Sequence, residues 1–385
     1  KQAWRVRLPA PIATSTHAPG TGILVGLNDA RLLCLSEEGV QLWEARLPAR
    51  PLKVAAGSIA GKGTLIAAAL EDRSVQAIDA KGRTLWRFGP LPEAEGRNSY
   101  GRSSPNVMRS IAVNDLNGDG RLEVAVGAGY IMALSQTGKL LWSEKHLKLT
   151  DGLRNMTVTD LNGDGRIEIL AADAWTYPFW YALSHNGQPY WMAAKKMGKP
   201  GEMDMKRLQL QGAPLAIASG KYLGTKETQS ACVDAKGVLH LADARGNLLG
   251  RFNVGEPSPA MASLDLDGDG SDELLAGSES HHLFALTGKC KLKWRVNCGG
   301  PVSAIAGLDA TPQSQGWVAI AVRQGPLLVA DSKGNIKARW LDRARRTTML
   351  IALHPHTDPT AGRIVTGASD GTLVAFEGTG RHGSF

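Results

Sequence analysis

The sequence has 385 residues, 43% of them hydrophobic, and a formal net charge of +8. No apolar run approaches the ~18–20 residues that a membrane helix needs, so no membrane span is expected. Forty-five glycines, nineteen prolines and many short apolar runs predict an all-β protein of short strands and tight turns. Four cysteines are too few for a disulfide scaffold, and buried free thiols are the preferred reading over a Cys290–Cys298 pair. The basic surplus favours an anionic partner.

The chain opens on a strand-like segment, Lys1 to Val6, with no visible signal peptide. The numbering is therefore expected to begin after a removed leader or at a cloning boundary.

A glycine followed by a tryptophan recurs along the chain and predicts a repeat architecture. An apolar strand ending in small residues comes before each copy, and a further strand links the two. The copies are Gly39…Trp43, Gly82…Trp86, Gly138…Trp142 and Gly187…Trp191, the longer Gly288…Trp294 and Gly334…Trp340, and a degenerate one from Gly246 to Phe252.

Each repeat therefore predicts four strands, and eight repeats of about 48 residues predict an eight-bladed β-propeller. We expect one domain over residues 1–385, with blades starting near residues 12, 51, 109, 154, 213, 259, 301 and 347. The last repeat lacks its tryptophan strand, and residues 3–8 around Trp4 match the missing piece. The N-terminal strand should therefore complete the last blade and remove a sheet edge. Tryptophan at one position in every blade indicates packing between blades rather than a platform for sugars.

Three nine-residue segments share an aspartate-rich pattern and begin at Asp115, Asp160 and Asp265. Oxygen-bearing side chains fall at positions one, three, five and nine, and residue seven would offer its backbone carbonyl. Ca²⁺ takes six to eight oxygens at ~2.3–2.6 Å, and glycines at positions four and six permit the left-handed turns of a coiled loop. The expected ligands are Asp115, Asn117, Asp119, Arg121 and Glu123; Asp160, Asn162, Asp164, Arg166 and Glu168; and Asp265, Asp267, Asp269, Ser271 and Glu273.

An EF-hand would place its bidentate glutamate at position twelve between helices, whereas here the acid is at position nine between β segments. The loops resemble the FG-GAP or VCBS-type repeat, and the Gly…Trp strands resemble the quinoprotein-like, PQQ-type blade. The resemblance implies three structural calcium ions, in blades three, four and six. It also implies a secreted, periplasmic or cell-surface location, because such loops need millimolar Ca²⁺.

A ligand is expected on the face opposite the metal loops, around blades two to four. The expected ligand-binding residues combine cations with an unusually aromatic turn. They are Arg102, Arg109, Arg154, Trp175 and Tyr177. Arginine binds carboxylate or sulfate in a forked geometry, which suits a uronic-acid or sulfated glycan. For Arg109 and Arg154, hydrogen bonding to neighbouring carbonyls is an equally good reading.

The main functional hypothesis is a secreted propeller that binds an anionic polysaccharide. A first alternative is a polysaccharide lyase, for which Arg109, Arg154, Tyr130 and His281 are weak catalytic candidates because no motif fixes their geometry. His281 is more readily explained as an ordinary turn residue. A second alternative is a protein interaction scaffold, as in integrin-like or outer-membrane-assembly propellers. A nucleic-acid partner is not expected outside the cytoplasm.

Overall fold

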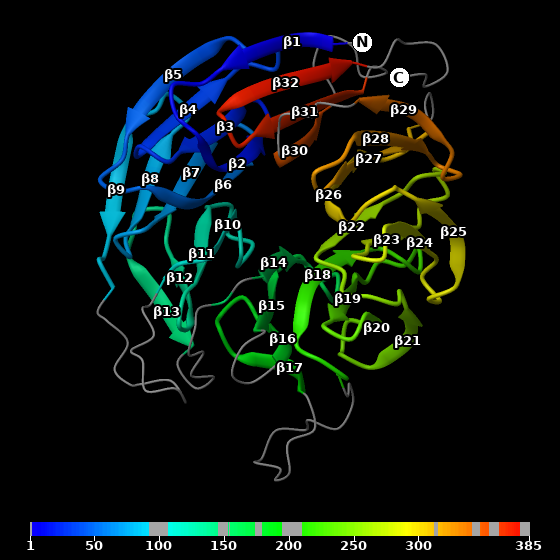
Figure 1. Cartoon of the computed structure of the whole chain (residues 1–385). Coiled ribbons are helices and arrows are strands. Elements are labelled where there is room, and N and C mark those ends of the chain that lie inside the picture. The colour runs from blue at the N-terminus through cyan, green and yellow to red at the C-terminus, as the bar shows by residue number, and fades with distance from the viewer. Residues whose placement is uncertain are drawn as a thin grey trace, which may run out of the picture. The chain divides into compact units, whose positions relative to one another are not determined.

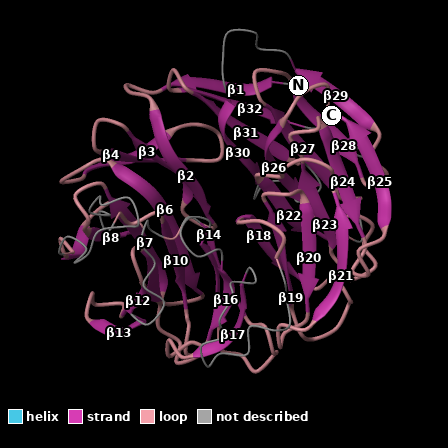
Figure 2. Ribbon diagram, turned by 60° about the horizontal axis from the view of Figure 1, so that its bottom comes forward, coloured by secondary structure: helices cyan, strands magenta, loops and turns pink. Residues whose placement is uncertain are grey.

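The computed structural model describes residues 2–91, 107–144, 153, 155–173, 179–194, 210–311, 315–340, 347–353 and 362–377. These residues form eight four-stranded antiparallel sheets and contain no helix (Figures 1 and 2). In particular, no helix in the described ranges could cross a membrane. The expected all-β fold, an eight-bladed β-propeller, is confirmed.

The chain divides into two compact units. The unit Ile12–Pro214 contains four sheets in chain order. Their strands are β2 Ile12–Ala18, β3 Gly22–Leu27, β4 Arg31–Leu35 and β5 Gln41–Arg46; β6 Pro51–Ile59, β7 Gly63–Leu70, β8 Val75–Asp79 and β9 Thr84–Phe88; β10 Ser110–Asn114, β11 Glu123–Gly127, β12 Ile131–Leu134 and β13 Leu140–Glu144; and β14 Asn155–Thr159, β15 Glu168–Asp173, β16 Phe179–Leu183 and β17 Pro189–Ala194.

The second unit joins Lys1–Pro11 to Leu215–Phe385. Three of its sheets are β18 Pro214–Gly220, β19 Gln229–Asp234, β20 Val238–Ala242 and β21 Leu248–Asn253; β22 Ala260–Leu264, β23 Glu273–Gly277, β24 His282–Leu286 and β25 Leu292–Asn297; and β26 Val302–Leu308, β27 Trp317–Val322, β28 Leu327–Asp331 and β29 Ile336–Trp340. The last sheet contains β30 Thr347–Leu353, β31 Arg363–Ala368, β32 Thr372–Glu377 and β1 Gln2–Arg7.

The N-terminal strand completes the last sheet, as predicted. β1 runs antiparallel to β32, with Trp4 opposite Ala375 and Arg7 opposite Thr372. The backbone N–H of Leu8 also donates to the carbonyl of Gly371. These hydrogen bonds cover an edge of β32 that would otherwise be open to pairing with another chain.

Burial along the strands explains their composition. The second and third strands are buried on both faces, as in β11 and β12, and are therefore continuously apolar rather than alternating. The fourth strands, such as β25, alternate between exposed and half-buried residues, as a strand at a sheet edge does. The cores lie between successive sheets: one cluster joins Leu65 and Ala77 of one sheet to Val124 and Met132 of the next.

Tryptophans on the fourth strands join successive blades, which confirms the packing role predicted for them. The indole N–H of Trp86 donates to the carbonyl of Gln136 at 2.7 Å, in the turn between β12 and β13 of the next sheet. The ring lies over Gly138 in the same turn, where a Cβ would be 2.7 Å from it. The same hydrogen bond joins Trp43 to Ala80, Trp142 to His185 and Trp294 to Ser332.

At the junction between the sheet of β21 and the sheet of β25, the strand carries the glycine and the turn carries the side chain. Gly250 on β21 lies opposite Leu241, the register that Trp86 occupies opposite Ala77. The facing turn carries Cys290 at φ +53°, where the other turns have glycine. A Cβ on Gly250 would be 3.0 Å from the Cβ of Cys290. The bulky group has therefore moved from the strand to the turn.

The pairing register of the third and fourth strands corrects the assignment of the two longer repeats, Gly288…Trp294 and Gly334…Trp340. Cys290, rather than Gly288, occupies the turn position that precedes Trp294 by four residues. In the next sheet, Ala338 lies opposite Val329 in the tryptophan register. Trp340, two residues further on, stacks on Phe376 instead, with ring centroids 4.4 Å apart.

All four cysteines are buried and free, as the preferred reading of the sequence expected. Burial raises the pKa of Cys34, Cys290 and Cys298 to about 11, so these thiols stay protonated at neutral pH.

We expect Gly138→Ala to destabilise the protein more than Gly61→Ala. Both glycines have positive φ, which costs a residue with a Cβ about 1–2 kcal/mol. Gly61 has open space around it, whereas a Cβ at Gly138 meets the Trp86 ring, and such overpacking costs about 1–3 kcal/mol more. Urea denaturation of the two variants would measure the difference. Equal losses would contradict a role for the indole–glycine contact.

We also expect Gly250→Trp to lower the melting temperature, because the indole would overlap Cys290. Adding Cys290→Gly should recover most of the loss by restoring the strand-tryptophan and turn-glycine pair. Contacting residues show coupling energies of about 0.5–3 kcal/mol. A double variant no more stable than Gly250→Trp alone would show that the two positions are not exchanged partners.

Candidate functional site

The three aspartate-rich loops each connect the first and second strands of a sheet, as predicted. They join β10 to β11, β14 to β15 and β22 to β23. The first two lie next to each other in the unit Ile12–Pro214: a Cβ on Gly118 would be 3.3 Å from the carbonyl oxygen of Gly165.

The first loop coils around its leading aspartate. Asp115 accepts hydrogen bonds from the backbone N–H of Gly118 at 2.8 Å, Asp119 at 3.1 Å and Gly120 at 2.7 Å. Both glycines have φ near +78°, which only glycine adopts without strain. At the end of the loop, Glu123 turns back and accepts the N–H of Leu116 at 2.9 Å. The second loop repeats this geometry around Asp160 and Glu168.

Negative charge in these two loops is not neutralised by side chains. Within the described ranges, no carboxylate among their expected ligands forms an ion pair, although Lys62 donates to the backbone carbonyl of Gly120 at 2.7 Å. Burial, together with repulsion from the aspartates of the same loop, raises the pKa of Glu123 and of Glu168. A bound cation would offset that cost, so the donor set fits Ca²⁺.

The third loop differs because a lysine enters it. Oxygens of Asp265, Asp267 and Asp269 lie within 4.8 Å of one another. Lys293 on β25 donates to Asp267 at 2.5 Å and to Glu273 at 2.8 Å. Two of the five expected ligands are therefore already held by an ammonium group.

Sequence reasoning missed Lys293, although the pattern contained a sign of it. The residue before the fourth-strand tryptophan is apolar or aromatic in the four sheets of the other unit, as Leu42, Leu85, Leu141 and Tyr190. On β25, beside the third loop, Lys293 occupies the corresponding place before Trp294. Burial raises the pKa of Glu273, while its hydrogen bond with Lys293 opposes that rise.

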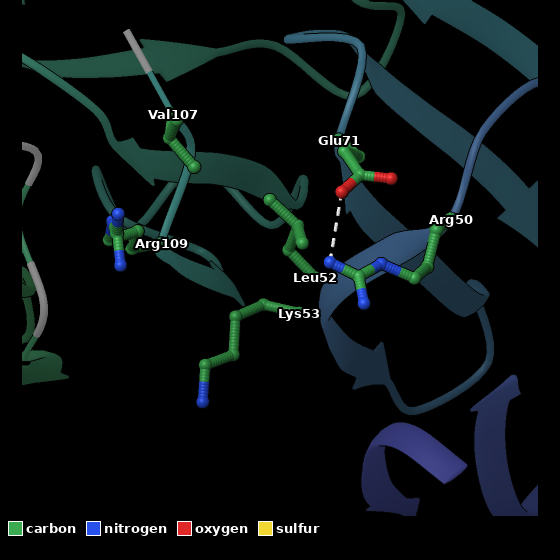
Figure 3. Close-up of a pocket in the computed structure, with 6 residues that line it drawn as sticks. All are labelled: Arg50, Leu52, Lys53, Glu71, Val107 and Arg109. Atoms are coloured by element: carbon green, nitrogen blue, oxygen red, sulfur yellow. Dashed lines mark hydrogen bonds and ion pairs between the residues drawn. The ribbon is translucent and has the colours of Figure 1, made fainter. Parts of the chain in front are cut away.

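A separate basic pocket of about 470 Å³ lies in the unit Ile12–Pro214 (Figure 3). β6 and β10, the first strands of neighbouring sheets, contact each other beside it. Leu52 and Val107 supply its apolar part. Its charged lining residues are Arg50, Lys53, Glu71 and Arg109.

The described lining of the pocket carries more positive than negative charge. Arg50 donates to Glu71, the one anion among these described residues, at 2.9 Å. Lys53 and Arg109 are exposed and have no ion-pair partner in the part of the chain that the structure describes. The Nε of Arg50 is buried and also has no acceptor there. Within the described part of the chain, the pocket therefore carries two cations, Lys53 and Arg109, without an ion-pair partner.

Of the five expected ligand-binding residues, the structure places Arg109 in this pocket. Arg102, Arg154, Trp175 and Tyr177 lie outside the described residues. Among the described residues no carbonyl accepts a hydrogen bond from the side chain of Arg109, and both readings given for it stay predictions. Its backbone N–H donates to Gly127 at 3.0 Å and fixes its place before β10.

The two other described candidates for lyase chemistry do not line this pocket. Tyr130 packs against the hydrophobic cluster that contains Met132, and burial raises its pKa, which opposes use as a proton acceptor. His281 belongs to the other unit and lies in the turn before β24 at φ +68°, with its carbonyl accepting the N–H of Cys298 at 2.8 Å. That position agrees with an ordinary turn residue.

Comparisons with known proteins agree with this architecture. Residues 1–172 match the family model described as outer membrane protein assembly factor BamB. No curated protein matches the sequence.

Solved structures match the chain over nearly its full length. BamB from Moraxella catarrhalis is 16% identical with a TM-score of 0.61, covering 99% of each chain. Saccharomyces cerevisiae Sqt1 is 11% identical with a TM-score of 0.74, covering 98% of this chain and 99% of its own. BBS1N, solved in complex with ARL6DN, is 12% identical with a TM-score of 0.58, covering 100% of this chain and 98% of its own. The chain is thus an eight-bladed β-propeller whose first 172 residues are similar to the PQQ-like repeat family described as outer membrane protein assembly factor BamB.

Proposed function

We propose that this protein is a protein-interaction scaffold that works outside the cytoplasm. The observation that carries the proposal is the match of residues 1–172 to an outer membrane protein assembly factor. The described lining of the basic pocket belongs to that matched segment and includes two cations that have no ion-pair partner among the described residues. An accessible, unpaired charge of this kind steers and selects a partner of opposite charge.

The polysaccharide hypothesis has less support. The described lining of the pocket contains no aromatic ring on which the face of a sugar could stack. Polysaccharide binding, lyase activity and the roles of Arg102, Arg154, Trp175 and Tyr177 stay predictions.

Capture of partners from the envelope fraction of the protein's own source tests the scaffold proposal. The immobilised protein should retain a defined protein after washing, identified by mass spectrometry and confirmed by binding of the purified pair. An array of anionic glycans should remain blank. A defined glycan bound in place of any purified protein would overturn the proposal.

We further propose that Ca²⁺ stabilises the first two loops by linking the start of β11 and of β15 to the preceding turn. Asp115, Asn117, Asp119, Glu123 and the carbonyl of Arg121 would hold one ion; the corresponding residues from Asp160 to Glu168 would hold the second. The third expected site consists of Asp265, Asp267, Asp269, Ser271 and Glu273. There Ca²⁺ would have to compete with the ammonium group of Lys293 for the carboxylates of Asp267 and Glu273.

Chelation should therefore lower the melting temperature. A ligand that binds only the folded state contributes about 2.7 kcal/mol at a hundredfold excess over its Kd. An unchanged melting curve in excess EDTA would contradict occupied calcium sites.

Lys293→Met should destabilise the protein in EDTA, because Glu273, only 4% exposed, loses its cation. Added Ca²⁺ should recover part of that loss if the freed carboxylates can bind it. Lys289→Met, which removes an exposed lysine from the turn before the same strand, is the matched control and should change little. Equal losses for Lys293→Met with and without Ca²⁺ would show that the third loop does not bind calcium.

A further inference from the structure

We propose that the basic pocket between β6 and β10 binds an acidic, extended peptide segment of the partner through two nearby carboxylates. This inference rests on the proposed scaffold function and names the chemistry by which the partner is recognised.

The first support is the arrangement of charge. Lys53 is on β6 and Arg109 directly precedes β10, so neighbouring sheets each supply one uncommitted cation. In Figure 3 the side chains of Lys53 and Arg109 lie away from the ion pair of Arg50 and Glu71. Leu52 lies between the two cations and this pair. Two separate cations match two carboxylates better than they match one.

The second support is the chemistry of the lining. Leu52 and Val107 can pack against the aliphatic stems of Glu or Asp side chains while their carboxylates reach the cations. Arg109 presents a planar fork that receives a carboxylate through two hydrogen bonds, whereas Lys53 acts as a compact charge. An entering carboxylate could also provide an acceptor for Nε of Arg50, which has none among the described residues.

The third support is size and composition. A volume of about 470 Å³ is in the range of ordinary ligand pockets. The described lining combines cations with the apolar side chains of Leu52 and Val107 and has no aromatic ring for a sugar face, so an acidic peptide fits it better than a uronic-acid chain does.

A labelled hexaglutamate peptide, with hexaglutamine as its neutral counterpart, provides the test by fluorescence anisotropy on the full chain. Hexaglutamate should bind at low ionic strength and weaken as salt is added, because exposed charges are screened. Hexaglutamine should not bind. Failure of hexaglutamate to bind, or equal binding of hexaglutamine, would overturn the inference.

Lys53→Gln and Arg109→Gln should each weaken hexaglutamate binding about 1.5- to fivefold, as expected for exposed charge pairs. Lys81→Gln makes the same charge change in the turn between β8 and β9, outside the pocket lining, and should leave binding unchanged. All three residues are exposed, so the melting temperatures should match that of the wild type. Equal weakening by Lys81→Gln would reduce the effect to net charge and overturn the inference. Binding of polygalacturonate but not hexaglutamate would assign the pocket to a glycan.

The two proposals fail in different ways. If a protein partner is captured equally by the wild type and by the double variant of Lys53 and Arg109, the scaffold stands and the pocket inference falls. If hexaglutamate binding depends on these two residues but no protein is captured, the pocket stands and the scaffold falls.

Discussion

The contact between an indole ring and a glycine of the next blade is the constraint on which this fold depends. Each four-stranded sheet is too small to bury both of its faces by itself, so its stability comes from its neighbours. The tryptophan fills the space between sheets, and its N–H satisfies a turn carbonyl that the next sheet leaves open. The glycine is needed twice, for its positive φ and for the absence of a Cβ under the ring.

The exchanged junction at Gly250 and Cys290 shows that the strand and the turn can change places in supplying the side chain and the glycine. One bulky side chain and one small residue must face each other, but either strand or turn can supply the bulky one. Cys290 accepts left-handed backbone to do so, which indicates that filling the space outweighs the conformational cost.

Sequence reasoning reached the fold because its strongest features are local and repeated. The spacing from Gly138 to Trp142 sets a turn and the following strand, and eight repeats, seven of them with a version of this pattern, leave few alternatives to a propeller. It failed where the pairing register decides the outcome. The prediction followed the identity of Gly288, although the four-residue spacing of Gly138 and Trp142 points to Cys290, and the register of the hairpin decides for Cys290.

The candidate sites were less predictable for the same reason. The coiled loops follow from aspartate and glycine spacing within nine residues, and the structure forms them as expected. The pocket combines Arg109 with Lys53 and Arg50, which are more than fifty residues away in the chain, and only the packing of β6 beside β10 brings them together. Lys293 likewise reaches the third loop from a strand twenty residues downstream.

The pairing of β1 with β32 has a consequence for how the protein is made. Among the strands of the propeller β1 is synthesised first, and its partner β32 is synthesised last. Contacts of such long sequence separation form slowly, because a large loop must close first. Until β32 has been made, β1 and then the growing last sheet each present an unpaired edge. A nascent chain of this kind would gain most from a chaperone during that interval, when it is most exposed to aggregation.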